Sequence, residues 1–189
     1  MKIKIQDMTL IALFTVLTIV SGKIAVPILT IPFTLQLAVS LLAGILLGAG
    51  RAMLSQGLYI LIGLLGLPVF AAGGGPAYVL QPTFGYLPGM MLAAGLVGWL
   101  ADRSLRRHAE LKFSRLMPVS LAGVAVTYLC GVGYLYLIKN FYAGTPVTLF
   151  KAIQAGMLPF LIVDMLKAGL AAWVGPRLRR LAGNAKPAQ

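Results

Sequence analysis

Acidic residues, cysteine and histidine are scarce in this sequence, and their scarcity excludes several kinds of site. Only four Asp or Glu residues stand among 189, against 16 Lys or Arg. The single cysteine, Cys130, rules out an intrachain disulfide and makes a structural metal site unexpected. With one histidine and a single carboxylate inside an apolar run, we find no Ser-His-Asp set and no carboxylate pair. We therefore expect that the protein is not an enzyme and needs no cofactor.

Charge of either sign is also rare, which excludes an ordinary soluble domain. Charged residues make up 11% of the chain and hydrophobic ones 59%, and the mean hydropathy is +0.91. Several apolar runs approach the roughly 20 residues that cross a bilayer as a helix, and none alternates with period two. We expect an all-α integral membrane protein, one polytopic domain over residues 1–189 with six transmembrane helices. Their approximate ranges are Met8–Gly22, Phe33–Ala49, Ala52–Leu67, Phe84–Ala101, Met117–Ile138 and Ala155–Val174.

The basic residues are distributed unevenly between the two sides of such a domain. With the N-terminus inside, the outer segments hold only Lys23, Lys139 and Lys151, while Lys167 falls within the last span. The other twelve are cytoplasmic: Lys2, Lys4, Arg51, Arg103, Arg106, Arg107, Lys112, Arg115, Arg177, Arg179, Arg180 and Lys186. This asymmetry places both termini in the cytoplasm. The basic loop, residues 102–115, is expected near anionic lipid headgroups and not on nucleic acid.

Two charged residues interrupt the last apolar run, in the stretch LIVDMLKAGL. Asp164 and Lys167 are three residues apart and so share one helix face. A charge at that depth costs several kcal/mol, so such groups face the protein interior or a wet cavity. They form either a structural ion pair or the polar end of a ligand site. Pro159, upstream, is expected to bend the helix and open space.

The stretch 71–86, AAGGGPAYVLQPTFGY, is rich in glycine and carries no charge. Its glycines and prolines predict an irregular outer loop between the third and fourth spans. It is either a plain connector or a lid in which Tyr78, Phe84 and Tyr86 cover a ligand.

In combination, these motifs resemble the BioY family over nearly the whole chain. The stretches on which the resemblance rests are IPFTLQLAVSLLAGILLG, YILIGLLGLPVFAAGGGPAY, the PTFGY that follows, and DMLKAGLA near the C-terminus. BioY proteins are the biotin-specific substrate-binding (S) components of energy-coupling factor (ECF) transporters. The resemblance implies an S-component-like fold in the bacterial cell membrane and high-affinity biotin capture and uptake.

The resemblance also assigns residues to the biotin site. Asp164 and Lys167 would contact the ureido ring, and Gln36 is a weaker polar candidate. The loop would enclose the bicycle and the valerate chain through Gly74, Tyr78, Thr83 and Tyr86. No arginine follows PTFGY to receive the biotin carboxylate, so loop amides or Lys167 remain the alternatives for that role.

Transport is expected to depend on partners, because the sequence has no nucleotide-binding motif. The resemblance implies a transmembrane coupling subunit and ATPase subunits, with the loaded S component toppling in the bilayer. The Ala-x-x-x-Ala docking pattern of the family is incomplete, since Val16 stands four residues after Ala12. Small residues at four-residue spacing favour internal helix packing: Gly44, Gly48, Gly85, Gly89 and Ala93. The alternatives are a facilitator that works without ATPases and a purely structural membrane protein.

Overall fold

A computed structural model describes residues 4–28, 31–108 and 110–181, which form seven α-helices, a 3₁₀ helix and a β-hairpin. The helices are α1 (Ile5–Lys23), α2 (Gln36–Leu47), α3 (Ala49–Leu64), α4 (Tyr86–His108), α5 (Phe113–Phe141), α6 (Leu149–Gly156) and α7 (Leu158–Leu181). The other elements are β1 (Ala25–Ile28), β2 (Ile31–Thr34) and η1 (Pro76–Leu80). Lys2 and Lys186, two of the predicted cytoplasmic charges, lie outside the described residues.

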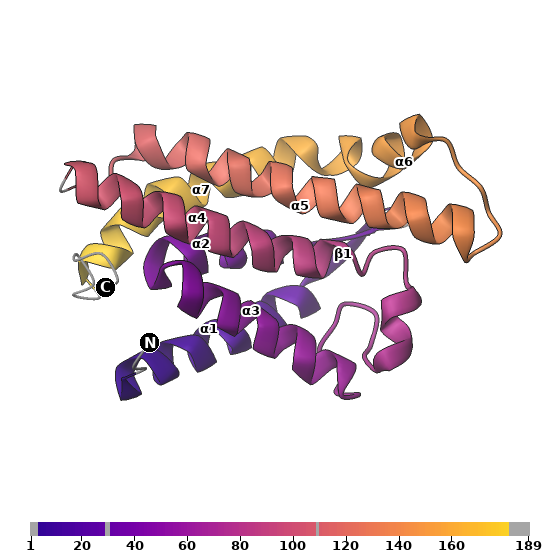
Figure 1. Ribbon diagram of the computed structural model, residues 1–189, viewed down its shortest axis with the longest axis horizontal. Helices are drawn as coiled ribbons and strands as arrows, with labels where there is room; N and C mark the ends of the chain where they lie inside the picture. Colours follow the sequence, from indigo (N-terminus) through magenta and orange to yellow (C-terminus); the bar gives the residue numbers. More distant parts are fainter. Residues whose placement is uncertain (1–3, 29–30, 109, 182–189) are drawn as a thin grey trace.

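The long helices run side by side along the molecule, and the start of α1 and the end of α7 lie at the same end of it (Figure 1). In the described part of the chain, α1, α5 and α7 are long and apolar enough to cross a membrane by themselves, and α2 is a shorter apolar helix. α4 is long enough, but its last turns carry Asp102, Arg103, Arg106 and Arg107, which lower its hydropathy. This arrangement is the all-helical bundle that the sequence predicted.

The helices differ from the predicted ranges mainly at their ends. The second was expected to begin at Phe33, but that residue lies in β2 and α2 begins at Gln36. The hairpin was not predicted. Its strands pair antiparallel from Ala25 with Thr34 to Ile28 with Ile31. It connects α1 to α2 at the outer end of the bundle and brings Thr34 toward the helix core.

The basic segment 102–115 is mostly helical, although we expected a loop. α4 continues to His108 and α5 begins at Phe113, so both helices extend beyond the apolar runs. The predicted last span is also divided, because α6 ends at Gly156 and α7 begins at Leu158. Pro159 therefore lies in the first turn of α7. The N–H groups of a first turn have no partner within the helix, so the missing N–H of proline costs nothing there. The helical run is interrupted at Met157, so the structure has a break just before Pro159 where we expected a bend.

α2 lies at the centre of the bundle and packs closely through small residues. Leu41, Ala43 and Ile45 are completely buried. A Cβ added at Gly44 would lie 2.6 Å from the Ala94 carbonyl oxygen of α4, closer than any side chain tolerates. Gly98 approaches the first residue of α3 equally closely. The small residues at four-residue spacing thus serve packing inside the domain.

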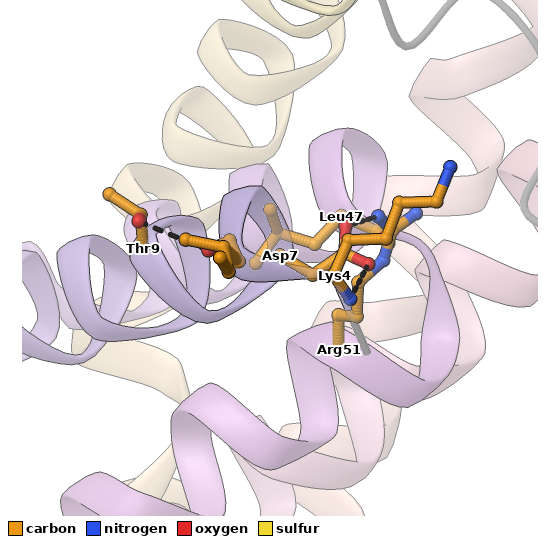
Figure 2. A network of polar contacts seen from close by, with 6 residues as sticks. Lys4, Asp7, Thr9, Leu47 and Arg51 are labelled. Carbon is orange, nitrogen blue, oxygen red and sulfur yellow. Dashed lines mark hydrogen bonds and ion pairs between the residues drawn. The ribbon is translucent and has the colours of Figure 1, made fainter. Parts of the chain in front are cut away.

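Two ion pairs stabilise the end of the bundle that carries the chain termini. Arg51 of α3 binds the Asp7 carboxylate of α1 and donates to the Leu47 carbonyl at 2.8 Å (Figure 2). Arg179 of α7 donates to the Asp102 carboxylate of α4 at 2.5 Å and to the Ile45 carbonyl of α2 at 2.8 Å. The second pair is buried, so it fixes three helices at one level.

Candidate ligand-binding site

A pocket lies among α2, α4, α5 and α7 and is covered by the end of β2 and by the glycine-rich loop. Its wall is mostly apolar and aromatic, and its two charged groups both lie on α7, a composition typical of small-molecule sites. Its lining residues are Thr34, Gln36, Leu37, Ala71, Tyr78, Thr83, Tyr86, Leu87, Met90, Thr127, Tyr128, Gly156, Phe160, Asp164 and Lys167.

Asp164 and Lys167 form a buried ion pair at the polar end of the pocket. Each is 7% exposed, and Lys167 Nζ lies 2.7 Å from Asp164 Oδ1. The same ammonium donates to the Thr34 carbonyl at 2.6 Å, which ties α7 to the hairpin. The spacing of three residues on α7 places both groups on the face that looks into the bundle. Charge inside the membrane region is thereby neutralised and still reachable from the pocket.

Tyr128 of α5 completes the hydrogen bonding of the carboxylate. Its hydroxyl donates to Asp164 Oδ2 at 2.5 Å, so the two oxygens of Asp164 have different protein partners. The ring lies nearly perpendicular to that of Tyr86, with centroids 6.5 Å apart. Sequence reasoning did not single out Tyr128. The polar dipeptide Thr127–Tyr128 within the apolar run of α5 is the signal that marks this position.

Tyr86 connects the pocket to the break between α6 and α7. Its hydroxyl donates to the Gly156 carbonyl at 2.7 Å, and its ring packs where Gly131 of α5 has no side chain. A Cβ at Gly156 would lie 2.6 Å from that hydroxyl. Tyr86 thus positions the start of α7, the helix that carries the ion pair.

The outer loop is held in place by a cluster of aromatic rings. Phe70 is completely buried, with its centroid 5.4 Å from that of Tyr59 and 4.4 Å from that of Tyr78. Lys23 at the end of α1 donates to the Phe70 carbonyl at 2.8 Å. Burial raises the pKa of the Tyr78 phenol above its usual value, although contacts with Ala72 and Thr83 oppose the shift. The phenol therefore stays protonated and able to donate.

Gln36, at the start of α2, joins the pocket wall to a buried polar network. Its side-chain nitrogen donates to the Tyr59 hydroxyl at 2.7 Å, and its oxygen accepts from the Thr34 hydroxyl at 3.3 Å. The network continues through Thr18 and Gln56 between α1 and α3. These bonds fix the orientation of the Gln36 amide beside the ion pair.

Six of the seven residues that the resemblance assigned to the biotin site line this pocket. Gly74 does not, and neither does Phe84, the third aromatic residue of the expected lid. A Cβ at Gly74 would lie 2.1 Å from the Leu67 carbonyl oxygen and 3.1 Å from that of Gly63. Gly74 therefore allows the loop to pack on the end of α3. The residues that sequence reasoning missed are Thr34, Leu37, Ala71, Leu87, Met90, Thr127, Tyr128, Gly156 and Phe160.

The chemistry of the pocket is that of binding. Within the described ranges, no group of three or more His, Cys, Asp or Glu side chains is arranged to hold a metal ion. Asp164 accepts hydrogen bonds and Lys167 donates them, while most of the remaining wall is aromatic or aliphatic, with Gln36 and three threonines as its other polar residues. Such a site suits a largely apolar ligand with a neutral head that carries both N–H donors and a carbonyl acceptor.

Comparison with known proteins agrees with this description. The sequence pattern of the BioY family matches residues 1–184. The chain is 36% identical to the "Probable biotin transporter BioY" of Lysinibacillus sphaericus over 183 residues, which are 95% of this chain and 90% of that protein. It is also 36% identical to the "Biotin transporter BioY" of Thermotoga maritima over 170 residues, 89% of this chain and 93% of the relative.

A solved structure shares the fold. It is a crystal structure of "the S-component for biotin from an ECF-type ABC transporter", 27% identical to this chain, with a TM-score of 0.78. The superposition covers 93% of this chain and 92% of the other.

Proposed function

The chain belongs to the BioY family, and we propose from this that it captures biotin as the S component of an ECF-type transporter. It is a multi-pass membrane protein and a transport component, not an enzyme. The pocket at Asp164 and Lys167 is our candidate for the biotin site. The observation that carries this assignment is a buried ion pair that opens into a mostly apolar and aromatic pocket.

The ureido ring of biotin is complementary to this pair. It presents two N–H donors and one carbonyl acceptor, and Asp164 and Lys167 offer the opposite set on one helix face. A carboxylate has about four lone-pair directions, and Lys167 and Tyr128 occupy two of those on Asp164. The remaining lone pairs of Asp164 accept hydrogen bonds from the ureido N–H groups. The thioether bicycle and the valerate chain then lie along Tyr86, Phe160 and Tyr78.

Release into the cell requires further subunits in this proposal. The sequence contains no phosphate-binding loop, so a transmembrane coupling subunit and ATPase subunits of an ECF module supply the energy. The clamp of Arg179 on Asp102 and Ile45 closes the cytoplasmic end of α2, α4 and α7. It supports capture from outside followed by reorientation of the whole domain.

Calorimetric titration of biotin into the purified protein tests the site. The Asp164→Asn variant is compared with Asp102→Asn, because both aspartates are buried and ion-paired but only Asp164 lines the pocket. We expect one-to-one binding in the unaltered protein and in Asp102→Asn, and binding weakened at least about tenfold in Asp164→Asn. Equal affinity in all three proteins would leave the family assignment intact and show that biotin does not bind at Asp164.

Uptake into proteoliposomes tests the need for partners. Vesicles that contain this chain alone are compared with vesicles that also contain the coupling and ATPase subunits with ATP inside or outside. Accumulation only with the complete module supports the S-component role. Equal flux through the chain alone would instead support the facilitator alternative.

A further inference from the structure

Two tryptophan–arginine pairs stand at the cytoplasmic ends of α4 and α7, away from the pocket. The Arg103 guanidinium carbon lies 5.4 Å from the Trp99 ring centroid, and that of Arg177 lies 4.2 Å from the Trp173 ring. In each pair the arginine follows the tryptophan by four residues, so it stacks on the indole one turn nearer the cytoplasm. The same arrangement therefore occurs on two separate helices.

The buried clamp shows that both pairs lie at one depth. Asp102 and Arg179 are in contact, and they are one and two residues from Arg103 and Arg177 respectively. At 1.5 Å per helical residue, the two exposed arginines are within about one turn of the same level. A bilayer that meets one pair at its surface meets the other pair too.

The side chains of both pairs are directed away from the protein core. Trp99 and Trp173 are 51% and 53% exposed, and both arginines are exposed as well. Indole rings prefer the membrane–water interface, where the apolar ring and the polar N–H are both satisfied. A guanidinium stacked on an indole keeps its edge free to bind a phosphate in the bidentate manner.

The surrounding charge favours an anionic occupant. Arg107 and Arg180 are exposed on the same two helix ends. The acidic groups nearby are mostly neutralised, because Asp102 is bound to Arg179, which leaves Glu110 as the exposed carboxylate. The cytoplasmic leaflet is the side on which anionic lipids attract basic segments.

We propose that the Trp99–Arg103 and Trp173–Arg177 pairs are binding sites for anionic phospholipids of the cytoplasmic leaflet. The guanidinium binds the lipid phosphate, and the indole lies beneath it at the level of the glycerol backbone. The two sites flank the clamp of α4 on α7, so bound lipid sets the depth of the helix that carries the ion pair of the pocket.

Intrinsic fluorescence is a direct test, because Trp99 and Trp173 are the only tryptophans of the chain. The full chain is reconstituted in vesicles of dioleoyl phosphatidylcholine that contain increasing fractions of dibrominated phosphatidylglycerol or dibrominated phosphatidylcholine. Bromine quenches tryptophan on contact. We expect the anionic lipid to bind about fivefold more strongly, the effect of one arginine near a charged surface. Trp99→Phe and Trp173→Phe report the two sites separately.

Charge variants separate a local site from a general attraction. In the Arg103→Gln/Arg177→Gln variant, the ratio of phosphatidylglycerol binding to phosphatidylcholine binding should fall to near one. Lys139→Gln/Lys151→Gln removes the same charge from the outer end and should leave it unchanged. Equal quenching by the two lipids in the unaltered protein would overturn the proposal without any variant. An equal loss of preference in both double variants would also overturn it, since a long-range field would then suffice.

Discussion

At the scale of single residues, the pocket depends on how the two oxygens of Asp164 are shared. Oδ1 accepts from Lys167 and Oδ2 from Tyr128, so the carboxylate is held between α7 and α5. Its plane is fixed before a ligand arrives. In the proposed biotin complex, this preorganisation removes the entropy that a mobile carboxylate would lose on binding.

Tyr128→Phe should weaken biotin binding roughly tenfold, because it removes a hydrogen bond to a charged group that fixes the carboxylate. The ring remains, so the apolar wall of the pocket is preserved. Calorimetric titration of biotin measures the change, and circular dichroism confirms that helix content is unaltered.

Tyr134→Phe is the matched control for that substitution. Tyr134 lies on the same helix and donates to the Val79 carbonyl, but it does not line the pocket. Its loss should leave the affinity for biotin within about twofold. If both variants lost affinity equally, the role of Tyr128 would be general packing and not the orientation of Asp164.

The sequence reveals Asp164 and Lys167 but not their partners. A charge within an apolar run is costly, so an aspartate and a lysine three residues apart already indicate a special site. The Tyr128 hydroxyl and the Thr34 carbonyl come from elements 36 and 133 residues away in the chain. Their directions depend on how α5 and the hairpin cross α7, which no local pattern encodes.

At the scale of elements, the glycine-rich loop is held at fixed points and is not a free connector. Phe70 inserts where Gly63 of α3 has no side chain, and Gly74 packs on the carbonyl oxygens of Leu67 and Gly63. Gly73 and Gly75 adopt positive φ angles that other residues avoid. The loop can therefore present Ala71 and Tyr78 to the pocket in one defined conformation.

Gly74→Ala should destabilise the protein by about 1–3 kcal/mol, because the added methyl group overlaps backbone atoms that cannot move independently. The displaced loop should also weaken biotin binding, although Gly74 does not line the pocket. Thermal unfolding in detergent and calorimetric titration measure the two effects.

Gly133→Ala on α5 provides the comparison, since nothing lies within 4 Å of a Cβ built there. Alanine is favoured over glycine inside a helix, so this change should be neutral or slightly stabilising. A Gly74→Ala variant as stable and as tightly binding as Gly133→Ala would show that the loop adapts freely.

The hairpin and the break between α6 and α7 show which elements sequence patterns miss. β1 and β2 are four residues each and contain Pro27 and Pro32, which face each other in the register. Strands so short give no periodic signal, and proline argues against a strand except at an edge. Around the break, residues 155–163 are all apolar, glycine or proline, so hydropathy alone cannot show where one helix ends and the next begins.

At the scale of the whole molecule, the two ends of the bundle differ in construction. The outer end holds the hairpin, the loop and the pocket mouth, whereas the cytoplasmic end is tightly packed around α2. Gly175 of α7 contacts Ile45, whose carbonyl accepts from Arg179. The charge asymmetry of the sequence predicted which end is cytoplasmic. It did not predict that Asp102 pairs with Arg179, because that contact depends on their positions in three dimensions.

A disulfide across the cytoplasmic end should leave biotin capture and module-driven uptake intact. A Cβ built at Gly175 lies 3.4 Å from Ile45 Cβ, close to the roughly 3.5–4.5 Å that a disulfide spans. The variant is Ile45→Cys/Gly175→Cys with Cys130→Ser, so that no other thiol competes. Uptake of radiolabelled biotin is measured in proteoliposomes with the complete ECF module, before and after reduction.

This cross-link distinguishes two ways of crossing the membrane. α2 and α7 both line the pocket, through Gln36 and Leu37 and through Asp164 and Lys167. A facilitator that opened a passage between them would have to separate their cytoplasmic ends, which the disulfide forbids, so its flux would stop until reduction. A domain that reorients as a whole keeps these ends together throughout. Undiminished uptake in the oxidised variant, equal to that of Cys130→Ser alone, therefore supports reorientation, and loss that reduction restores would assign transport to helix separation instead.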